Sequence, residues 1–151
     1  MTERSILINA SANIVYELVA DPMRMARWSP ECGRCRWVGD TQRAEVGARF
    51  RGTSRNGWHR WTTTSQITDM HPDELFAWEV TYLCQPVARW EYRIQPHDDE
   101  VELVESVEDR RGALLRAFSP YITGSRDRAT RNRDTMETTL QAVKAAAEAV
   151  R

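Results

Sequence analysis

The sequence predicts an α+β domain in which a curved, seven-stranded antiparallel sheet surrounds a long C-terminal helix. Three observations support this prediction. Apolar and polar residues alternate with period two in successive short runs between Arg34 and Arg110. From about Ser125 onward, apolar residues recur at spacings of four and three, as on one side of a helix. Before these runs, the pattern indicates an opening strand followed by two short helices.

The first thirty residues account for the opening strand and the two helices. Ile6 and Ile8 alternate with polar neighbours, as in a half-buried strand. Ser11 is placed to cap the first helix. A second helix is expected from Pro22 to Trp28, because proline suits the first helical position and another proline two residues after Trp28 blocks continuation. The apolar residues of the first helix are Ile14, Val15, Leu18 and Val19.

Six further strands are expected between Arg34 and Arg110. One face of these strands is apolar, whereas the neighbouring positions are mostly Arg and Glu, so one face packs and the other meets water. The turn sequences that separate the strands are Gly39-Asp40, Asn56-Gly57, His71-Pro72-Asp73 and His97-Asp98-Asp99. The apolar face comprises Val46, Phe50, Trp61, Ile67, Phe76, Trp78, Val80, Trp90, Tyr92, Ile94, Val101, Leu103 and Val107.

The last part of the chain predicts a helix that the sheet must cover. A bent sheet contacts such a helix at one end and parts from it at the other, so we expect a cavity between them. The segment from Ala113 to Gly124 is apolar but has no sustained period and is broken by Pro120, so it could serve as a lid. The apolar stripe of the helix comprises Met136, Leu140, Val143, Ala147 and Val150.

Composition limits the classes of function. A chain of 151 residues, 41% hydrophobic and 28% charged, fits one folded domain over residues 1–151. The net charge of −1 argues against nucleic acid as a partner, because that binding needs an excess of Lys and Arg. No apolar run is long enough to span a membrane and no secretory signal is recognisable, so we expect a cytoplasmic protein. One basic stretch is interpreted as a solvated helix turn: Arg126, Arg128, Arg131 and Arg133.

A series of short motifs runs along nearly the whole chain. They are Ala10-Ser11-Ala12, Val15-Tyr16-Glu17, Asp21-Pro22, Trp28-Ser29-Pro30-Glu31, Val46-Gly47-Ala48-Arg49-Phe50-Arg51-Gly52, Arg60-Trp61-Thr62-Thr63 and Trp90-Glu91-Tyr92. In this order and spacing they resemble the START-like (SRPBCC) superfamily, in particular its bacterial polyketide cyclase/dehydrase-like members. The resemblance implies a helix-grip fold with a hydrophobic cavity, which in that superfamily serves lipid carriage, ligand sensing, aromatic cyclisation or coenzyme positioning. It supplies an architecture and no reaction, because no shared catalytic motif is present.

Six tryptophans are a large aromatic content for this length, and several fall on the predicted inner face. They are candidates for the wall of a ligand pocket, although they could equally fill an ordinary core. Trp58 and Trp28 lie near predicted loops and could flank an entrance. The residues expected to bind a ligand are Trp28, Phe50, Trp61, Thr63, Trp78, Trp90, Tyr92, Glu105 and Met136.

Polar residues on the apolar face need a reason, because an unpaired buried polar group costs on the order of 1–3 kcal/mol. Glu105 lies between Leu103 and Val107 on the inner face. With Tyr92 or His59 it could orient a ligand's carbonyl or hydroxyl, or act as a general acid/base. The alternative is a structural hydrogen-bond network, or a Glu105 at the sheet edge that reaches water.

The Cys32-Gly33-Arg34-Cys35 sequence has the spacing of a redox pair or of half a zinc site. A second paired motif is missing from the sequence, and the order of elements offers no βαβ unit of the thioredoxin kind, so we expect no metal and no redox role. In a reducing compartment these cysteines should be thiols. Motifs for nucleotides, serine hydrolases and zincins are also missing from the sequence, and we expect no cofactor.

Three functions remain open. The first is binding of a small hydrophobic or aromatic molecule, lipid-like or polyketide-like, in the internal cavity. The second is a cyclase or dehydratase that uses the same cavity, with Glu105, His59 or Tyr92 moving protons. The third is a protein-interaction module whose cavity has collapsed and whose surface binds a partner or a second copy, as in a homodimer.

Overall fold

The computed structural model describes residues 1–125 and 127–150 and shows the predicted α+β architecture. All of its strands belong to one antiparallel sheet, in the order β1-β7-β6-β5-β4-β3-β2. In chain order the elements are β1 (Thr2–Ile8), α1 (Ala12–Val19), the 3-10 turn η1 (Pro22–Arg24), α2 (Met25–Trp28), β2 (Cys32–Trp37), β3 (Arg49–Asn56), β4 (His59–His71), β5 (Leu75–Tyr82), β6 (Gln85–His97), β7 (Glu100–Asp109), α3 (Ala113–Thr123) and α4 (Arg128–Val150).

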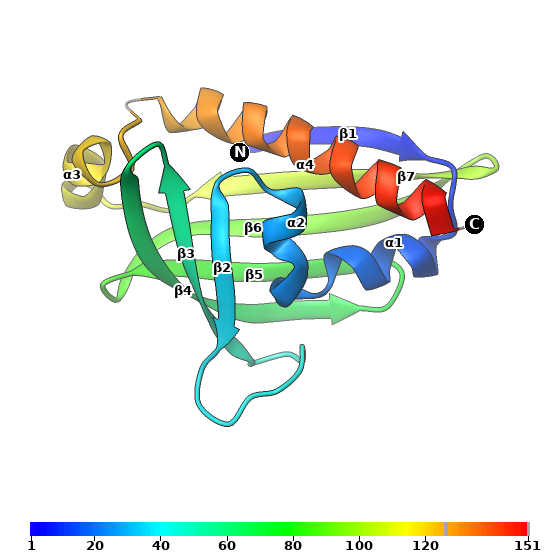
Figure 1. The fold of residues 1–151 in the computed structure, drawn as a ribbon, viewed down its shortest axis with the longest axis horizontal. Coiled ribbons are helices and arrows are strands. Elements are labelled where there is room, and N and C mark those ends of the chain that lie inside the picture. The colour runs from blue at the N-terminus through cyan, green and yellow to red at the C-terminus, as the bar shows by residue number, and fades with distance from the viewer. Residues whose placement is uncertain (126, 151) are drawn as a thin grey trace.

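The sheet bends around its helices. In Figure 1, β5, β6, β7 and β1 run along the long axis, whereas β2 and β3 cross them steeply at the other end of the sheet. The helix α4 lies beside β1 across the concave side, and α1 and α2 lie on the same side below it. The seven-stranded sheet gripping a long C-terminal helix is therefore confirmed.

Local signals in the sequence explain the first helices. The Ser11 hydroxyl accepts a hydrogen bond from the Ile14 amide at 3.3 Å and caps α1, as predicted. Asp21 caps the 3-10 turn in the same way, by accepting from the Met23 amide at 3.0 Å. The second predicted helix, from Pro22 to Trp28, consists of this turn followed by the single turn of α2.

The predicted turns coincide with the ends of strands, but one turn was not predicted. Between β5 and β6 the chain reverses at Leu83 and Cys84, both with positive φ (49° and 64°). Left-handed turns are usually marked by Gly, Asn or Asp, and Leu and Cys do not favour this backbone conformation. The turn was therefore not predicted from the sequence.

The segment 113–124, which has no sustained period and could serve as a lid, forms the helix α3, followed by Gly124 at φ 72° in a left-handed C-cap. Pro120 lies inside α3, near its C-terminal end. Proline there removes one backbone hydrogen bond, and a packed helix tolerates this loss close to its end.

Two residues assigned to apolar faces are exposed, because Val46 lies in the loop before β3 and Val150 ends α4.

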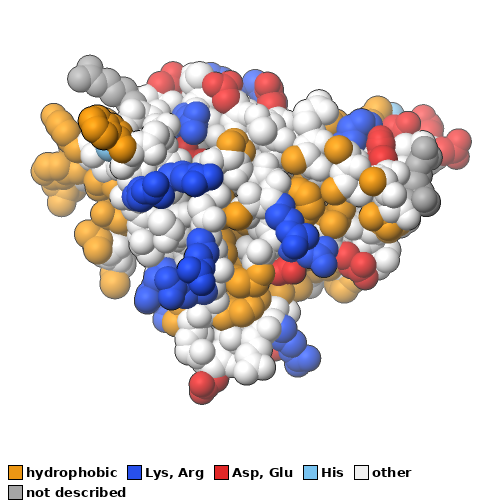
Figure 2. Space-filling model, viewed as in Figure 1, with side chains coloured by type: hydrophobic (Ala, Val, Ile, Leu, Met, Phe, Trp, Pro, Cys, Tyr) orange, Lys and Arg blue, Asp and Glu red, His pale blue; other side chains and the backbone are white. Residues whose placement is uncertain are grey.

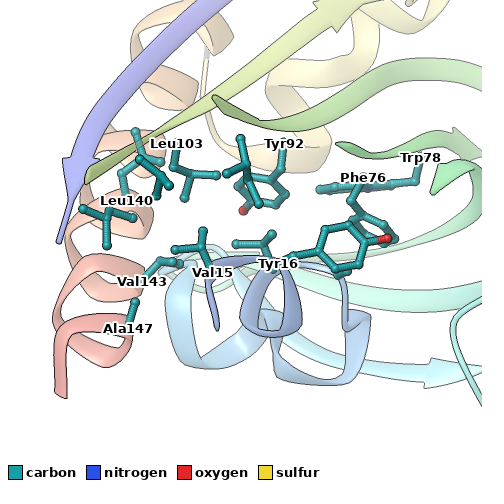
Figure 3. Packing of buried hydrophobic residues seen from close by; sticks show 14 of the residues in the cluster. Val15, Tyr16, Phe76, Trp78, Tyr92, Leu103, Leu140, Val143 and Ala147 are labelled. Atoms are coloured by element: carbon teal, nitrogen blue, oxygen red, sulfur yellow. The ribbon is translucent and has the colours of Figure 1, made fainter. Parts of the chain in front are cut away.

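The core fills the space between α1, α4 and the sheet. Figure 3 shows Val15 of α1, Leu140 and Val143 of α4 and Leu103 of β7 converging on one another. Phe76, Leu103 and Val143 are completely buried. This end of the sheet is closed by packing, so a cavity must lie toward its other end. Within the described residues, no helix is both long and apolar enough to cross a membrane.

Candidate ligand cavity

The sheet, α2 and the first half of α4 enclose a cavity of about 160 Å³. A protein cavity of about 150 Å³ can hold one benzene molecule, so this space matches a single aromatic ring. Six large apolar side chains from β3, β4, β5 and β6 contribute to the wall: Phe50, Trp61, Trp78, Val80, Val87 and Trp90. A second hollow, of about 540 Å³, is an open groove between β1 and α4 whose charged residues Arg4 and Glu137 already pair with each other.

Most of the residues expected to bind a ligand lie together at this cavity: Phe50, Trp61, Thr63, Trp78, Trp90, Tyr92 and Glu105. Three candidates lie elsewhere. Trp28 donates its indole N–H to the Leu18 carbonyl at 3.3 Å. Met136 is completely buried in a separate cluster with Ala88. His59 lies at the start of β4, beside Gly124.

The aromatic wall follows from the pairing of β5 with β6. Trp78 lies directly opposite Trp90, and their rings are nearly parallel, 11° apart with centroids at 6.3 Å. Tyr92 follows two residues later on the same face and contacts Trp78 at a centroid distance of 5.7 Å. Figure 3 shows Phe76 and Trp78 side by side, with Tyr92 farther along the same face. Residues two apart on a strand share a face, so the period-two pattern places these rings side by side.

Glu105 lies opposite Tyr92, on β7, and is only 4% exposed. Burial raises the pKa of its carboxyl to about 8, and a hydrogen bond with Tyr92 opposes this rise in part. Burial, and then the neighbouring Glu105, raise the pKa of Tyr92 well above its ordinary value. At neutral pH both groups are therefore protonated, and the Glu105 carboxyl has an O–H to donate.

Two polar atoms of the cavity wall are buried and unpaired among the described residues. They are Oε2 of Glu105 and Oγ1 of Thr135, a residue of α4. An unpaired buried polar atom is destabilising, and natural proteins keep few of them. Both belong to residues that line one hollow, so a ligand with oxygen atoms is the simplest partner for them.

Charged residues close the side of the cavity where β2 meets α4. Glu31 binds Arg128 through two hydrogen bonds, the shorter 2.6 Å, and Arg131 through a third at 3.0 Å. The Arg128 guanidinium also lies over the Trp61 ring, 5.9 Å from its centroid. Arg128 and Glu31 line the cavity and are largely buried, so the interpretation of this stretch as a solvated helix turn is corrected for Arg128.

Sequence reasoning missed this ion-pair cluster because its members are about a hundred positions apart. Glu31 lies between α2 and β2, and the packing of α2 against α4 brings it to the arginines. One signal was available: Trp28-Ser29-Pro30-Glu31 was among the motifs that carried the resemblance, but its carboxylate was not assigned a role.

Two smaller hollows, of about 90 and 40 Å³, lie next to the cavity on the side of α3. Trp61 and Val87 line all three, so these two side chains separate the spaces. Ser119 and Thr123 of α3 line the smaller hollows. The helix α3, which the sequence pattern did not predict, therefore lies next to the same system of cavities.

The two cysteines of the Cys32–Cys35 pair lie on β2, at the edge of the sheet, and both line the cavity. Cys84 is exposed at the turn between β5 and β6. Over residues 1–125 and 127–150, no three His, Cys, Asp or Glu side chains gather as metal ligands would.

The comparisons with known proteins agree on the fold. The family model of the polyketide cyclase / dehydrase and lipid transport proteins matches residues 2–148. A polyketide-cyclase-like protein from Corynebacterium glutamicum is 31% identical over 95% of this chain and 88% of its own, with a TM-score of 0.59. No curated protein matches the sequence.

More distant structures share the fold alone. An aromatase/cyclase from Streptomyces sp. R1128 is 20% identical over 97% of this chain and 92% of its own, with a TM-score of 0.65. A major latex-like protein from Panax ginseng is 10% identical over 97% of this chain and 95% of its own, with a TM-score of 0.73. With the family match over residues 2–148, the chain belongs to the polyketide cyclase/dehydrase and lipid transport family, of the START-like (SRPBCC) superfamily that its sequence resembles.

Proposed function

We propose that the protein binds a small aromatic molecule that carries a carbonyl or hydroxyl oxygen, with the ring in the 160 Å³ cavity and the oxygen at Glu105. The observation that supports this proposal most strongly is the pair of unpartnered buried oxygens, on Glu105 and Thr135, in a cavity whose wall includes three tryptophans. Apolar walls with a few convergent polar groups are typical of small-molecule sites.

The size and shape of the cavity favour one ring over a long acyl chain. Trp78 and Trp90 present near-parallel faces, and a ligand ring can stack or pack edge-on against them. A longer ligand would have to pass Trp61 and Val87 to enter the smaller hollows beneath α3. We therefore propose that Trp61 limits ligand length.

The protonation of Glu105 determines which oxygen it can bind. Below a pKa of about 8 the carboxyl is neutral and donates to a carbonyl oxygen. Above that pH it is an acceptor only, so it accepts from a phenolic hydroxyl but no longer donates to a ketone.

Binding experiments can use this difference. Acetophenone, phenol and ethylbenzene have similar rings but carry a carbonyl, a hydroxyl and no oxygen. Isothermal titration calorimetry below pH 8 should show that acetophenone binds more tightly than ethylbenzene. Above pH 8 acetophenone should lose this advantage in affinity, whereas phenol should still bind more tightly than ethylbenzene. A Glu105→Leu variant should bind acetophenone and ethylbenzene equally at both pH values. Failure of all three compounds to bind would contradict the proposal.

A second function, as a cyclase or dehydratase, is supported by one specific observation. A carboxyl whose pKa lies near neutrality and that is hydrogen-bonded to a tyrosine is suited to general acid/base catalysis. One structure of the same fold is that of an aromatase/cyclase. If the protein catalyses ring closure of a poly-β-ketone, Glu105→Gln should abolish turnover while binding of an aromatic product persists. Equal turnover by the variant would remove Glu105 from the chemistry.

The alternative of a protein-interaction module required a collapsed cavity. The structure has a hollow with unpaired polar atoms in its wall, which that alternative does not explain. An exposed apolar face does exist on α3, formed by Leu114, Phe118 and Tyr121, and Figure 2 shows hydrophobic side chains gathered at that end of the molecule. It is separate from the cavity wall around Glu105.

A further inference from the structure

The cysteines of β2 face the same side of their strand because the strand is irregular. Residues three apart on a regular strand point to opposite faces. Here Cys32 pairs with Ser54 and Cys35 pairs with Gly52, and a register shift between Cys32 and Arg34 accommodates one extra residue. Ser54 and Gly52 are two apart and share a face, so both cysteines point into the cavity, with their sulfur atoms 3.6 Å apart.

A glycine lies at the irregular position of the strand. A Cβ atom at Gly33, the residue between the shifted pairs, would lie 3.0 Å from the Thr53 carbonyl oxygen, so a larger residue would crowd the backbone of β3. Gly52 lies opposite Cys35, and its Cα side faces the Cys35 sulfur. The β-bulge and the paired thiols are thus one local structure, which spacing alone did not reveal.

We propose that Cys32 and Cys35 form a dithiol–disulfide centre in the cavity wall, where Cys32 attacks the disulfide of a small molecule and Cys35 resolves the resulting mixed disulfide. The sulfur atoms need to approach by roughly 1.5 Å to reach a disulfide bond length of about 2.05 Å. Both cysteines are half-buried, and β2 is an edge strand of the sheet.

The electrostatics support this order of attack. The hydrogen bond with Cys35 lowers the pKa of Cys32, and Arg55 lowers it further, whereas burial and Glu31 oppose this. The same hydrogen bond, followed by burial, raises the pKa of Cys35. The thiolate is the nucleophile in such exchange, so Cys32 reacts first. The cause is the neighbouring thiol and not the helix N-terminus found in thioredoxin-like pairs.

The exchange balances in two steps. The Cys32 thiolate bonds to one sulfur of R–S–S–R, and the other leaves as RS⁻. Cys35 then gives up its proton and attacks the Cys32 sulfur, which releases the second RS⁻. In total the protein loses two protons and two electrons, and the small disulfide leaves as two thiols. No step uses the aromatic ligand proposed above, so the proposal of a dithiol centre does not depend on the proposed function.

The test uses oxidised glutathione and a Cys84→Ser background, which removes the exposed third thiol. After exposure at neutral pH, acid quenching and alkylation, intact-mass spectrometry should find a protein two hydrogen atoms lighter, with both alkylatable thiols lost and no glutathione attached. Adding Cys35→Ser should stop the reaction at one glutathione bound to Cys32. Adding Cys32→Ser should slow the reaction of the remaining thiol.

The same reaction in urea is the control for the role of the fold. Unfolding removes the bulge that holds the two thiols on one face, so glutathione should then stay attached for longer before the second thiol displaces it. The proposal is overturned if both thiols of the native protein remain alkylatable, or if glutathione stays attached although Cys35 is present.

Discussion

Replacing Glu105 with Gln should remove a loss of stability that the wild-type protein undergoes as the pH rises. The carboxyl has an ordinary pKa of 4.5 and a pKa of about 8 in the folded protein, because burial disfavours its charged form. The folded state thus binds this proton more tightly than the unfolded chain does. Its contribution to the free energy of unfolding is complete below pH 4.5 and is lost as the pH rises to about 8.

The magnitude follows from the same two values. Because each tenfold change in proton affinity corresponds to about 1.4 kcal/mol, the rise from 4.5 to about 8 amounts to about 5 kcal/mol. Glutamine has nearly the same shape and carries no charge at any pH. The variant should therefore become more stable than the wild type above pH 8, while the two converge toward pH 4.5.

Urea unfolding followed by tryptophan fluorescence, at several pH values, measures this difference directly. Other titrating groups, such as Asp69 and Asp109, affect both proteins equally and cancel in the comparison. Glu102→Gln changes a carboxylate on the opposite face of β7 and should leave the wild-type pH profile unchanged. Parallel curves for wild type and Glu105→Gln from acid to alkaline pH would refute the reasoning, because they would mean that Glu105 is not held protonated by burial.

Three other substitutions test separate parts of the structure. Trp61→Ala should join the cavity to the hollows beneath α3. In calorimetry, the two-ring ligand 2-acetonaphthone should then gain about tenfold in affinity relative to acetophenone, or about 1.4 kcal/mol. Trp58→Ala, at a 90% exposed residue, should leave this ratio of affinities unchanged. Glu31→Gln should destabilise the protein by about 2 kcal/mol in urea unfolding, because it leaves the largely buried Arg128 without its carboxylate. Glu45→Gln, which breaks an exposed pair with Arg43, should cost less than about 0.5 kcal/mol. Equal losses of stability in the two variants would contradict this role of Glu31. Ser11→Ala should lower stability by about 1 kcal/mol through loss of the α1 cap, and no change in unfolding would argue against the cap.

The sequence predicted the features that depend on a regular period of apolar residues, such as which side chains share a strand face. Period-two alternation placed Trp78, Trp90 and Tyr92 on one face, and the pairing of β5 with β6 brings Trp78 opposite Trp90. The same alternation put Glu105 on the inner face, opposite Tyr92. These predictions succeeded because one buried face determines the register of a strand.

Features that depend on distant or irregular backbone could not be predicted in this way. The ion pair between Glu31 and Arg128 joins residues 97 positions apart. The two cysteines share a face only because of a bulge, which reverses the expected alternation. Met136 was placed at the cavity on the basis of its helical stripe, but the stripe does not specify which turn of α4 lies over the hollow and which packs on Ala88.

A crystal structure with 4-bromoacetophenone tests most directly whether the cavity binds a ring beside Trp78 and Trp90 with its oxygen at Glu105. Anomalous scattering locates the bromine, and therefore the direction of the ring, without ambiguity. We predict the ring beside Trp78 and Trp90, with its carbonyl oxygen within hydrogen-bond distance of the Glu105 carboxyl. Bromine in the groove between β1 and α4, or a carbonyl that points away from Glu105, would contradict the account.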